Sequence, residues 1–221
     1  INENHYPLIM KSSSSFLISI EGIEGCGKST LIQHLKDNLP RIYSQKKFHF
    51  FREPGATLWG EKVRSILLDA HLQRSTLSEV FLFISARSEL IQQQLIPLLQ
   101  KDNQVIILDR FFDSTYVYQG HAQNIDLNYL KTLHQAPGLK LIPDKTLYLK
   151  ISAQTSLARQ QARNQDKDYF EQWGLEKIEK LVGGFDSLAQ EEPQRFAVID
   201  AELSFEKVLQ QSTEVFKKVI Q

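Results

Sequence analysis

Short runs of apolar residues alternate along this chain with longer segments in which apolar residues recur every three or four positions. The short runs predict buried strands, and the longer segments predict helices with one apolar face. Strands are expected at residues 16–20, 47–51, 104–108, 144–149 and 196–199. Helices are expected at residues 28–39, 58–68, 76–99, 127–135, 152–163 and 173–190, with further helical stretches around Thr115 and from Ser204. Pro40 is expected to end the first helix, because proline lacks an N–H donor.

This alternation of strands and helices predicts the fold class. Strands joined by helices imply parallel crossovers, and strands that are apolar throughout imply a sheet covered on both faces. We therefore expect a three-layer α/β fold in which a five-stranded parallel sheet lies between layers of helices. Ligands bind beyond the carboxyl ends of the strands in such sheets, so functional residues are expected directly after each strand.

Length and composition indicate one ordinary globular domain. The 221 residues suit a single core, and no repeat or linker divides the chain. Apolar residues make up 42% and charged residues 24%, which argues against disorder. Residues 1–14 lack the basic and apolar regions of a signal peptide, so we expect a disordered leader or cloning remnant there and a domain at residues 15–221.

Charge and cysteine usage exclude several classes of protein. Lys+Arg and Asp+Glu both number 26, and this zero net charge argues against a protein that coats nucleic acid. No apolar stretch approaches the roughly 18 residues that span a bilayer. The single cysteine, Cys26, excludes an intrachain disulfide and fits a reducing compartment. We expect a cytoplasmic protein without a membrane or nucleic-acid partner, and the six histidines suggest no zinc site.

One motif indicates a nucleotide. Residues 22–29 read GIEGCGKS and match G-x-x-x-x-G-K-[ST] in full, between an expected strand and an expected helix. Glycines allow successive N–H groups to point at phosphate oxygens, and the helix that follows adds its positive end. Lys28 is expected to reach the outer phosphates and Ser29 to hold Mg²⁺. The residues expected to bind ATP are Glu24, Gly25, Cys26, Gly27, Lys28, Ser29 and Thr30.

Three further segments indicate which kind of nucleotide-binding protein this is. They are REPG at residues 52–55, Phe83-x-x-x-Arg87, and Asp109-Arg110 followed by Ser114, Thr115, Tyr118 and Gln119. Together they resemble the thymidylate kinase family, and the glycine-containing phosphate loop without an arginine is similar to the family's bacterial subclass. The resemblance runs from about Phe16 to the C-terminus. It implies a P-loop NTPase fold, the substrates ATP and dTMP, and a homodimer, for which the apolar surfaces of residues 77–99 are candidates.

Phosphoryl transfer requires two phosphate groups held in line with their charge neutralised. Asp109 ends an apolar strand next to the phosphate loop, where a carboxylate could bind Mg²⁺ or its waters; its alternative role is to cap the following helix. Arg110 can grip the acceptor phosphate with two hydrogen bonds. By resemblance Arg52 is a second phosphate contact, and Arg64 is either a third or part of a solvated helix face.

The resemblance also assigns residues to the acceptor nucleoside. Phe83 and Arg87 share a helical face, and the resemblance has Phe83 stack on thymine and Arg87 donate to its carbonyl edge; Phe83 as core packing is the alternative. Ser114, Thr115 and Gln119 are expected to contact base and sugar, and Tyr118 to exclude a 2′-hydroxyl. Glu53 and Pro54 belong to this site, and the bond between them is a candidate cis peptide.

By the same resemblance a short lid around residues 159–171 supplies a cation to the transferred group. Arg163 and then Arg159 are the candidates, and a solvated helix face is the alternative for each. Where the family has D-R-x-E this chain reads DYFE at residues 168–171, so Tyr169 replaces an expected arginine. Lys167 could substitute as a point charge, although it lacks the bidentate fork.

The expected activity is transfer of the γ-phosphoryl group from MgATP to dTMP, which gives ADP and dTDP. Lys28, Arg110, Arg163, Arg159 and Asp109 are the expected catalytic residues, and Ser29 and Asp109 the expected metal ligands. Two alternatives stay open: a kinase for another pyrimidine nucleotide or a nucleoside, and a nucleotide-binding paralogue whose altered lid no longer supports transfer.

Overall fold

The protein is built on a five-stranded parallel sheet. A computed structural model describes residues 11–163 and 168–220. The strands are β1 (Phe16–Glu21), β2 (Lys47–Arg52), β3 (Gln104–Asp109), β4 (Lys145–Lys150) and β5 (Phe196–Asp200), in the spatial order β2-β3-β1-β4-β5. All four pairings are parallel. The expected five-stranded parallel sheet is therefore confirmed.

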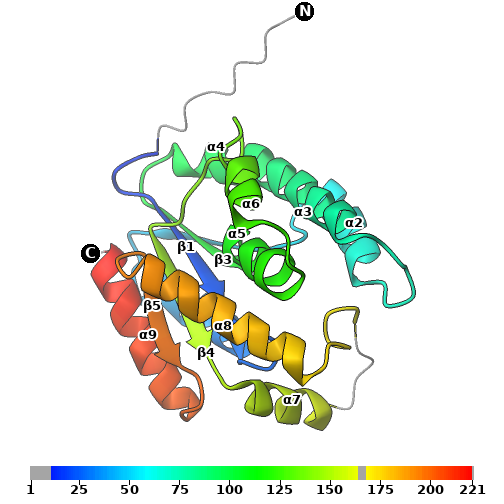
Figure 1. The fold of residues 1–221 in the computed structure, drawn as a ribbon. Coiled ribbons are helices and arrows are strands. Elements are labelled where there is room, and N and C mark those ends of the chain that lie inside the picture. The colour runs from blue at the N-terminus through cyan, green and yellow to red at the C-terminus, as the bar shows by residue number, and fades with distance from the viewer. Residues whose placement is uncertain (1–10, 164–167, 221) are drawn as a thin grey trace, which may run out of the picture.

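Helices cover both faces of the sheet. They are α1 (Lys28–Ile42), α2 (Leu58–Leu68), α3 (Thr76–Leu90), α4 (Ile96–Leu99), α5 (Phe112–Thr115), α6 (Leu127–His134), α7 (Ala153–Ala162), α8 (Leu175–Glu191) and α9 (Phe205–Ile220), with π-helical segments η1 (Ile91–Leu95) and η2 (Tyr116–Ala122). The chain passes from β1 to β2 in one direction along the sheet and returns through β3, β4 and β5 in the other. Right-handed crossovers then place α1 on one face and α3, α6 and α8 on the other, and Figure 1 shows α8 crossing in front of the strands.

One helix prediction differs from the structure at a proline. Pro40 does not end α1, which continues to Ile42. Proline removes a single N–H, and the backbone N–H of Tyr43 still donates to the Leu39 carbonyl, so the last turn closes. The helix expected over residues 76–99 is confirmed as one continuous helical stretch, formed by α3, the π-helical segment η1 and α4, which contains Pro97.

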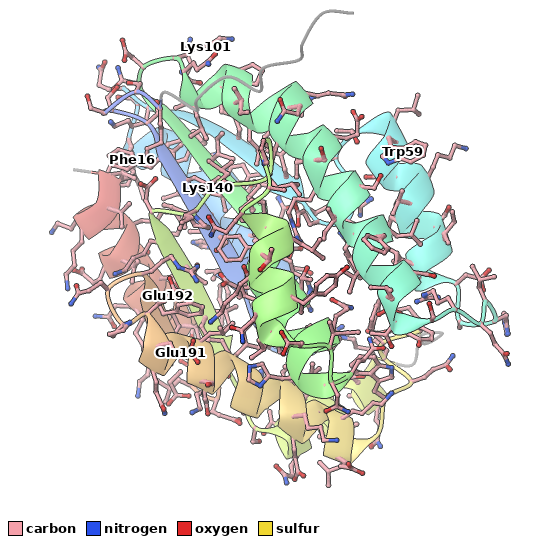
Figure 2. The ribbon with its side chains drawn as sticks, turned by 45° about the horizontal axis from the view of Figure 1, so that its top comes forward. Phe16, Trp59, Lys101, Lys140, Glu191 and Glu192 are labelled. Atoms are coloured by element: carbon pink, nitrogen blue, oxygen red, sulfur yellow. The ribbon has the colours of Figure 1, made fainter. Side chains whose placement is uncertain are left out.

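The core forms around the three central strands. Leu17, Ile18 and Ile20 of β1 are fully buried, as are residues 105–108 of β3. Figure 2 shows side chains filling the space between the sheet and its helices, with Phe16 near the amino end of β1. Because every strand runs the same way, all five carboxyl ends meet at one edge of the sheet, where the candidate site lies. Within the described ranges, no helix has both the length and the apolar character that a bilayer crossing requires.

The expected leader at residues 1–14 is only partly described. Residues 1–10 lie outside the described residues. Residues 11–14 contact the domain: the Ser12 N–H donates to the Leu99 carbonyl at 2.8 Å, and Lys11 pairs with Asp144. Ser14 also accepts a hydrogen bond from the Asn103 N–H. The structure thus places residues 11–14 against the domain.

A buried ion pair links the helix after β3 to the start of β5. Asp113 and Arg195 form two hydrogen bonds of 2.6 and 2.8 Å, and Thr146 accepts a third from Arg195. Both side chains are almost wholly removed from water. Such a pair fixes geometry because each charge would be costly if left alone.

Replacing Arg195 with methionine leaves the Asp113 carboxylate buried without its partner. We expect Arg195→Met to lower the free energy of unfolding by about 3 to 5 kcal/mol in denaturant titrations. The exposed pair of Lys131 and Glu191 provides the control, since Lys131→Met should cost no more than about 1 kcal/mol. Equal losses for the two variants would contradict this role for Arg195.

Candidate active site

A cavity of about 320 Å³ opens at the carboxyl edge of the sheet. Its wall combines the phosphate loop after β1 with residues that follow β2 and β3. Every residue expected to bind a nucleotide or a metal lies in this wall. The expected catalytic residues also lie there, except Arg159. The wall consists of Glu24–Thr30, Arg52–Pro54, Arg64, Leu68, Phe83, Arg87, Asp109–Phe111, Ser114, Thr115, Tyr118, Gln119, Arg163, Asp168, Phe170 and Glu171.

The phosphate loop depends on glycines with positive φ. Gly25 and Gly27 have φ of 79° and 91°, a region that other residues avoid. A Cβ on Gly25 would also lie 3.1 Å from the Ser156 carbonyl oxygen. The helix begins directly after the loop, at Lys28, so its unpaired N–H groups face the cavity. The Lys28 Nζ donates to the Gly22 carbonyl at 3.0 Å, which folds the ammonium over the loop.

Arg110 joins the turn after β3 to the phosphate loop. Its guanidinium donates to the Gly22 carbonyl at 2.9 Å and to Glu24 Oε1 at 2.8 Å. The Tyr118 hydroxyl donates to the same carboxylate oxygen at 2.6 Å, and the guanidinium lies 5.0 Å from the centre of the Tyr118 ring. Arg110 has a φ of 68°, which is unfavourable for a residue with a Cβ and is found where structure around it imposes the conformation.

Glu21, which the sequence analysis did not select, holds this turn in place. Its carboxylate accepts from the Phe111 N–H at 2.7 Å and from the Ser114 hydroxyl at 2.6 Å. Burial, assisted by the nearby Asp113 carboxylate, raises the pKa of Glu21 to about 7. A charged residue at the end of an otherwise apolar strand was the signal that could have identified it.

Arg87 is one of the most deeply buried side chains, at 1% exposure. Its guanidinium donates to Glu53 Oε2 at 2.8 Å and to the Thr115 hydroxyl at 3.0 Å. The same group lies 2.6 Å from His134 Nε2, and burial together with Arg87 lowers the pKa of His134 to about 3, so the neutral ring accepts this hydrogen bond. Sequence reasoning missed His134, because nothing in its local pattern indicates an arginine partner.

Gln119 is oriented by a second buried acid. Glu79 is fully buried, and its Oε1 accepts from Gln119 Nε2 at 2.9 Å and from Gln123 Nε2 at 2.7 Å. Its other oxygen accepts from Arg74. Neither residue was expected at the site, because a charged residue in the first turn of a helix, such as Glu79, or in a loop, such as Arg74, usually faces solvent.

The segment after β2 supplies two more arginines. Arg52 pairs with Glu61 at 2.9 Å, and both side chains are substantially exposed. Arg64 donates to the Pro54 carbonyl at 3.0 Å and lines the cavity, which favours its role at the site over the solvated alternative. The bond between Glu53 and Pro54 is cis, as the sequence suggested.

The two lid arginines differ in position. Arg159 donates to the carbonyls of Gly25 and Ala201, at 3.2 and 3.1 Å, and so contacts the phosphate loop from outside the cavity. Arg163 lines the cavity, is about half exposed, and lies 3.9 Å from Glu171. The geometry therefore favours Arg163 as the cation that reaches a bound nucleotide. Lys167, the suggested substitute for the missing arginine, lies outside the described residues.

The residues present fit a magnesium ion bound with phosphate. Ser29 and Asp109 line the same cavity and offer a hydroxyl and a carboxylate oxygen. No cluster of three or more His, Cys, Asp or Glu side chains suited to a metal occurs in residues 11–163 and 168–220. Mg²⁺ needs no such cluster, because it usually combines one or two protein oxygens with phosphate oxygens and waters.

Replacing Glu21 with glutamine should change how stability depends on pH. The pKa of Glu21 is raised from its ordinary 4.5 to about 7 in the folded chain, so folding takes up a proton between these values and wild-type stability falls as pH rises through them. We expect Glu21→Gln to gain on the order of 3 kcal/mol relative to wild type between pH 4.5 and 7.5 in denaturant unfolding. If the unfolding free energies of Glu21→Gln and wild type changed with pH in the same way, this expectation would be contradicted. Glu179→Gln, at an exposed position, is the control and should keep the pH dependence of wild type.

Comparison with known proteins agrees with the geometry of the site. A family model described as thymidylate kinase matches residues 20–212. Curated thymidylate kinases from Thermoanaerobacter sp. (strain X514) and Chlorobium phaeobacteroides are 36% and 41% identical over 203 and 193 residues, covering 92% and 84% of this chain and 98% and 87% of theirs. The crystal structure of thymidylate kinase from Ehrlichia chaffeensis superposes with a TM-score of 0.72 at 29% identity, covering 91% of this chain and 98% of that one. With its phosphate loop and its strand-end arginines in one cavity, this chain belongs to the thymidylate kinase family.

Proposed function

We propose that this chain transfers the γ-phosphoryl group of MgATP to dTMP and releases ADP and dTDP. One observation carries the proposal: a single cavity contains a complete phosphate loop and, facing it, a pocket with a buried arginine and aromatic rings. Two nucleotides could therefore meet with their phosphates between these two parts. Family membership supports the same reaction.

The donor half of the cavity binds phosphate through backbone and Lys28. Loop N–H groups and the start of α1 face the donor phosphates, and the Lys28 ammonium can turn from the Gly22 carbonyl to a phosphate oxygen at little cost. Ser29 and Asp109 would hold Mg²⁺, which when bound neutralises charge on the donor phosphates.

The acceptor half concentrates positive charge from two strand ends. Arg110 lies between the phosphate loop and the pocket, held by Glu24, with Arg52 and Arg64 nearby in the wall. Their guanidinium groups can bind the acceptor phosphate through paired hydrogen bonds. Holding this phosphate near the donor converts an encounter of two anions into an oriented reaction.

Base selection is assigned to the inner end of the pocket. Phe83 offers a ring face to a pyrimidine, and Arg87 an N–H edge to a carbonyl oxygen. Thr115 and Gln119 are already oriented by hydrogen bonds to Arg87 and Glu79. Tyr118, fixed by its hydrogen bond to Glu24, would lie against the sugar and disfavour a 2′-hydroxyl.

A coupled ADP-release assay with saturating MgATP and a panel of nucleoside monophosphates tests the proposal. We expect turnover with dTMP to exceed that with dCMP, UMP and thymidine. Faster turnover with another pyrimidine nucleotide would show that this nucleotide, and not dTMP, is the acceptor. Binding of both nucleotides without ADP release would favour the non-catalytic paralogue instead.

We expect Arg163→Ala to reduce kcat by about 10³-fold, because its guanidinium would no longer stabilise charge on the transferred group. Arg159→Ala should mainly raise the KM for ATP, since Arg159 contacts the phosphate loop from behind. Arg41→Ala, at an exposed position near the end of α1, is the control. Near-normal kcat in both lid variants would overturn the lid assignment.

We also propose a cytoplasmic homodimer. Cys26 is buried and unpaired, which suits a reducing compartment. A group of exposed apolar side chains lies on α2 and α3: Leu58, Trp59, Ile66, Leu77 and Phe81, with exposures from 41% to 83%. The Trp59 indole N–H donates to the Ser85 hydroxyl of α3 at 2.8 Å, so Trp59 lies where α2 and α3 meet. This apolar patch, carried by two helices that pack on each other, suits a self-interface.

A double substitution in this patch should separate the protomers. We expect Trp59→Lys/Phe81→Glu to halve the molar mass measured by light scattering after size exclusion. Ile142→Lys, at an exposed apolar position outside the patch, should leave the mass unchanged. A wild-type protein that elutes as a monomer would refute the dimer.

A further inference from the structure

Arg74, in the loop between α2 and α3, has an unusually complete set of partners. Its side chain is only 5% exposed. The Nε donates to Glu79 Oε2 at 3.1 Å, and the two terminal nitrogens donate to backbone carbonyls of the same loop region, the closest being that of Leu67 at 2.6 Å. Acceptors thus surround the edge of the guanidinium, and its flat faces are left for stacking.

Tyr169 occupies one of these faces. The Arg74 Cζ lies 3.8 Å from the centre of the Tyr169 ring, well within the range of a cation–π contact. The backbone also connects the two segments, because the Tyr169 N–H donates to the Leu68 carbonyl at 3.4 Å. Tyr169 belongs to the lid segment at residues 168–173, which lies near the loop between α2 and α3 in Figure 1.

The neighbouring residues of the lid segment form part of the pocket wall. Phe170 is buried and lines the cavity. Its ring centre lies 6.1 Å from that of Phe83 and 5.7 Å from that of Tyr118. Trp173 also packs on Tyr118, at 5.9 Å. The lid segment is therefore packed against two residues assigned to the acceptor nucleoside.

Glu79 extends this contact to the inner end of the pocket. One carboxylate oxygen accepts from Arg74, and the other accepts from Gln119 and Gln123. A continuous series of contacts thus runs from the Tyr169 ring through Arg74 and Glu79 to Gln119. Only a planar cation with several donors can fill the middle position, because it must stack, bind a carboxylate and bind carbonyls together.

We propose that Arg74 is a positioning residue that couples the lid to the acceptor site. It orients Gln119 through Glu79, and its stack with Tyr169 holds residues 168–173 against the pocket. Occupation of the pocket by dTMP then steadies the lid, and an ordered lid strengthens acceptor binding by the same factor. The response to dTMP and the kinetics rest on the proposed function; the contact between the lid segment and the loop that carries Arg74 does not.

Hydrogen exchange of the backbone amides in residues 168–173 tests the coupling without catalysis. Tyr169→Leu removes the ring and keeps apolar bulk, whereas Tyr169→Phe keeps the ring and is the matched control. In the ligand-free protein we expect exchange in this segment to be roughly three- to tenfold faster in Tyr169→Leu than in wild type or Tyr169→Phe. Exchange in α9, far from the lid, should be the same in all three.

The response to dTMP distinguishes coupling from simple packing. Adding dTMP alone should slow exchange of residues 168–173 in wild type and Tyr169→Phe, and clearly less in Tyr169→Leu. Arg74→Lys keeps the charge opposite Glu79 but loses the planar face, so it should reproduce the Tyr169→Leu result. The double variant should lose no more than either single variant, because both remove the same contact.

Steady-state kinetics give a second measure of the coupling between the lid segment and the acceptor site. We expect the KM for dTMP to rise roughly three- to tenfold in Tyr169→Leu, with kcat reduced less, and Tyr169→Phe to restore the wild-type value. Equal exchange and equal KM in Tyr169→Leu and Tyr169→Phe would overturn the inference. A wild-type protein that does not turn over dTMP would instead refute the proposed function, and the ligand-free exchange result would still decide whether Tyr169 and Arg74 hold the lid.

Discussion

The site depends on a carboxylate at the end of the central strand. Glu21 binds the Phe111 N–H and the Ser114 hydroxyl, and these contacts fix the turn after β3 against the end of β1. Within that turn Arg110 adopts a positive φ and crosses to the phosphate loop, where Gly22 and Glu24 accept its hydrogen bonds. Donor and acceptor machinery thus share one rigid junction. Glu21 is fully buried, so this junction excludes water, and that burial raises the pKa of its carboxyl to about 7.

Buried guanidinium groups with acidic partners organise the rest of the pocket. Arg87 pairs with Glu53, Arg74 with Glu79, and Arg195 with Asp113, each pair largely removed from water. A buried pair adds little net stability compared with apolar packing, but breaking it is costly, so it holds one geometry. These pairs connect residues next to β2 and β5 with α3 and α5. Catalytic side chains placed on such a framework need little reorganisation when charged substrates bind.

Tyr169 illustrates how a departure from a familiar pattern can be compensated nearby. An arginine at this position would bring a second guanidinium up to Arg74, whereas a tyrosine ring attracts it. In place of a cation, residue 169 thus supplies a contact that holds this segment against the loop between α2 and α3. Arg163 is the lid arginine that still faces the cavity.

The sequence by itself determined the parallel α/β fold, the phosphate loop and most of the cavity wall, because these follow from local periodicity, glycine geometry and residues placed directly after strands. The helix end at Pro40 was harder to predict, since the loss of one N–H can be absorbed by the following turn. Only the tertiary structure decided the roles of Glu21, Glu79, Arg74 and His134. Their partners lie in other elements, and the burial that makes each charge or hydrogen bond matter arises only when the chain has folded.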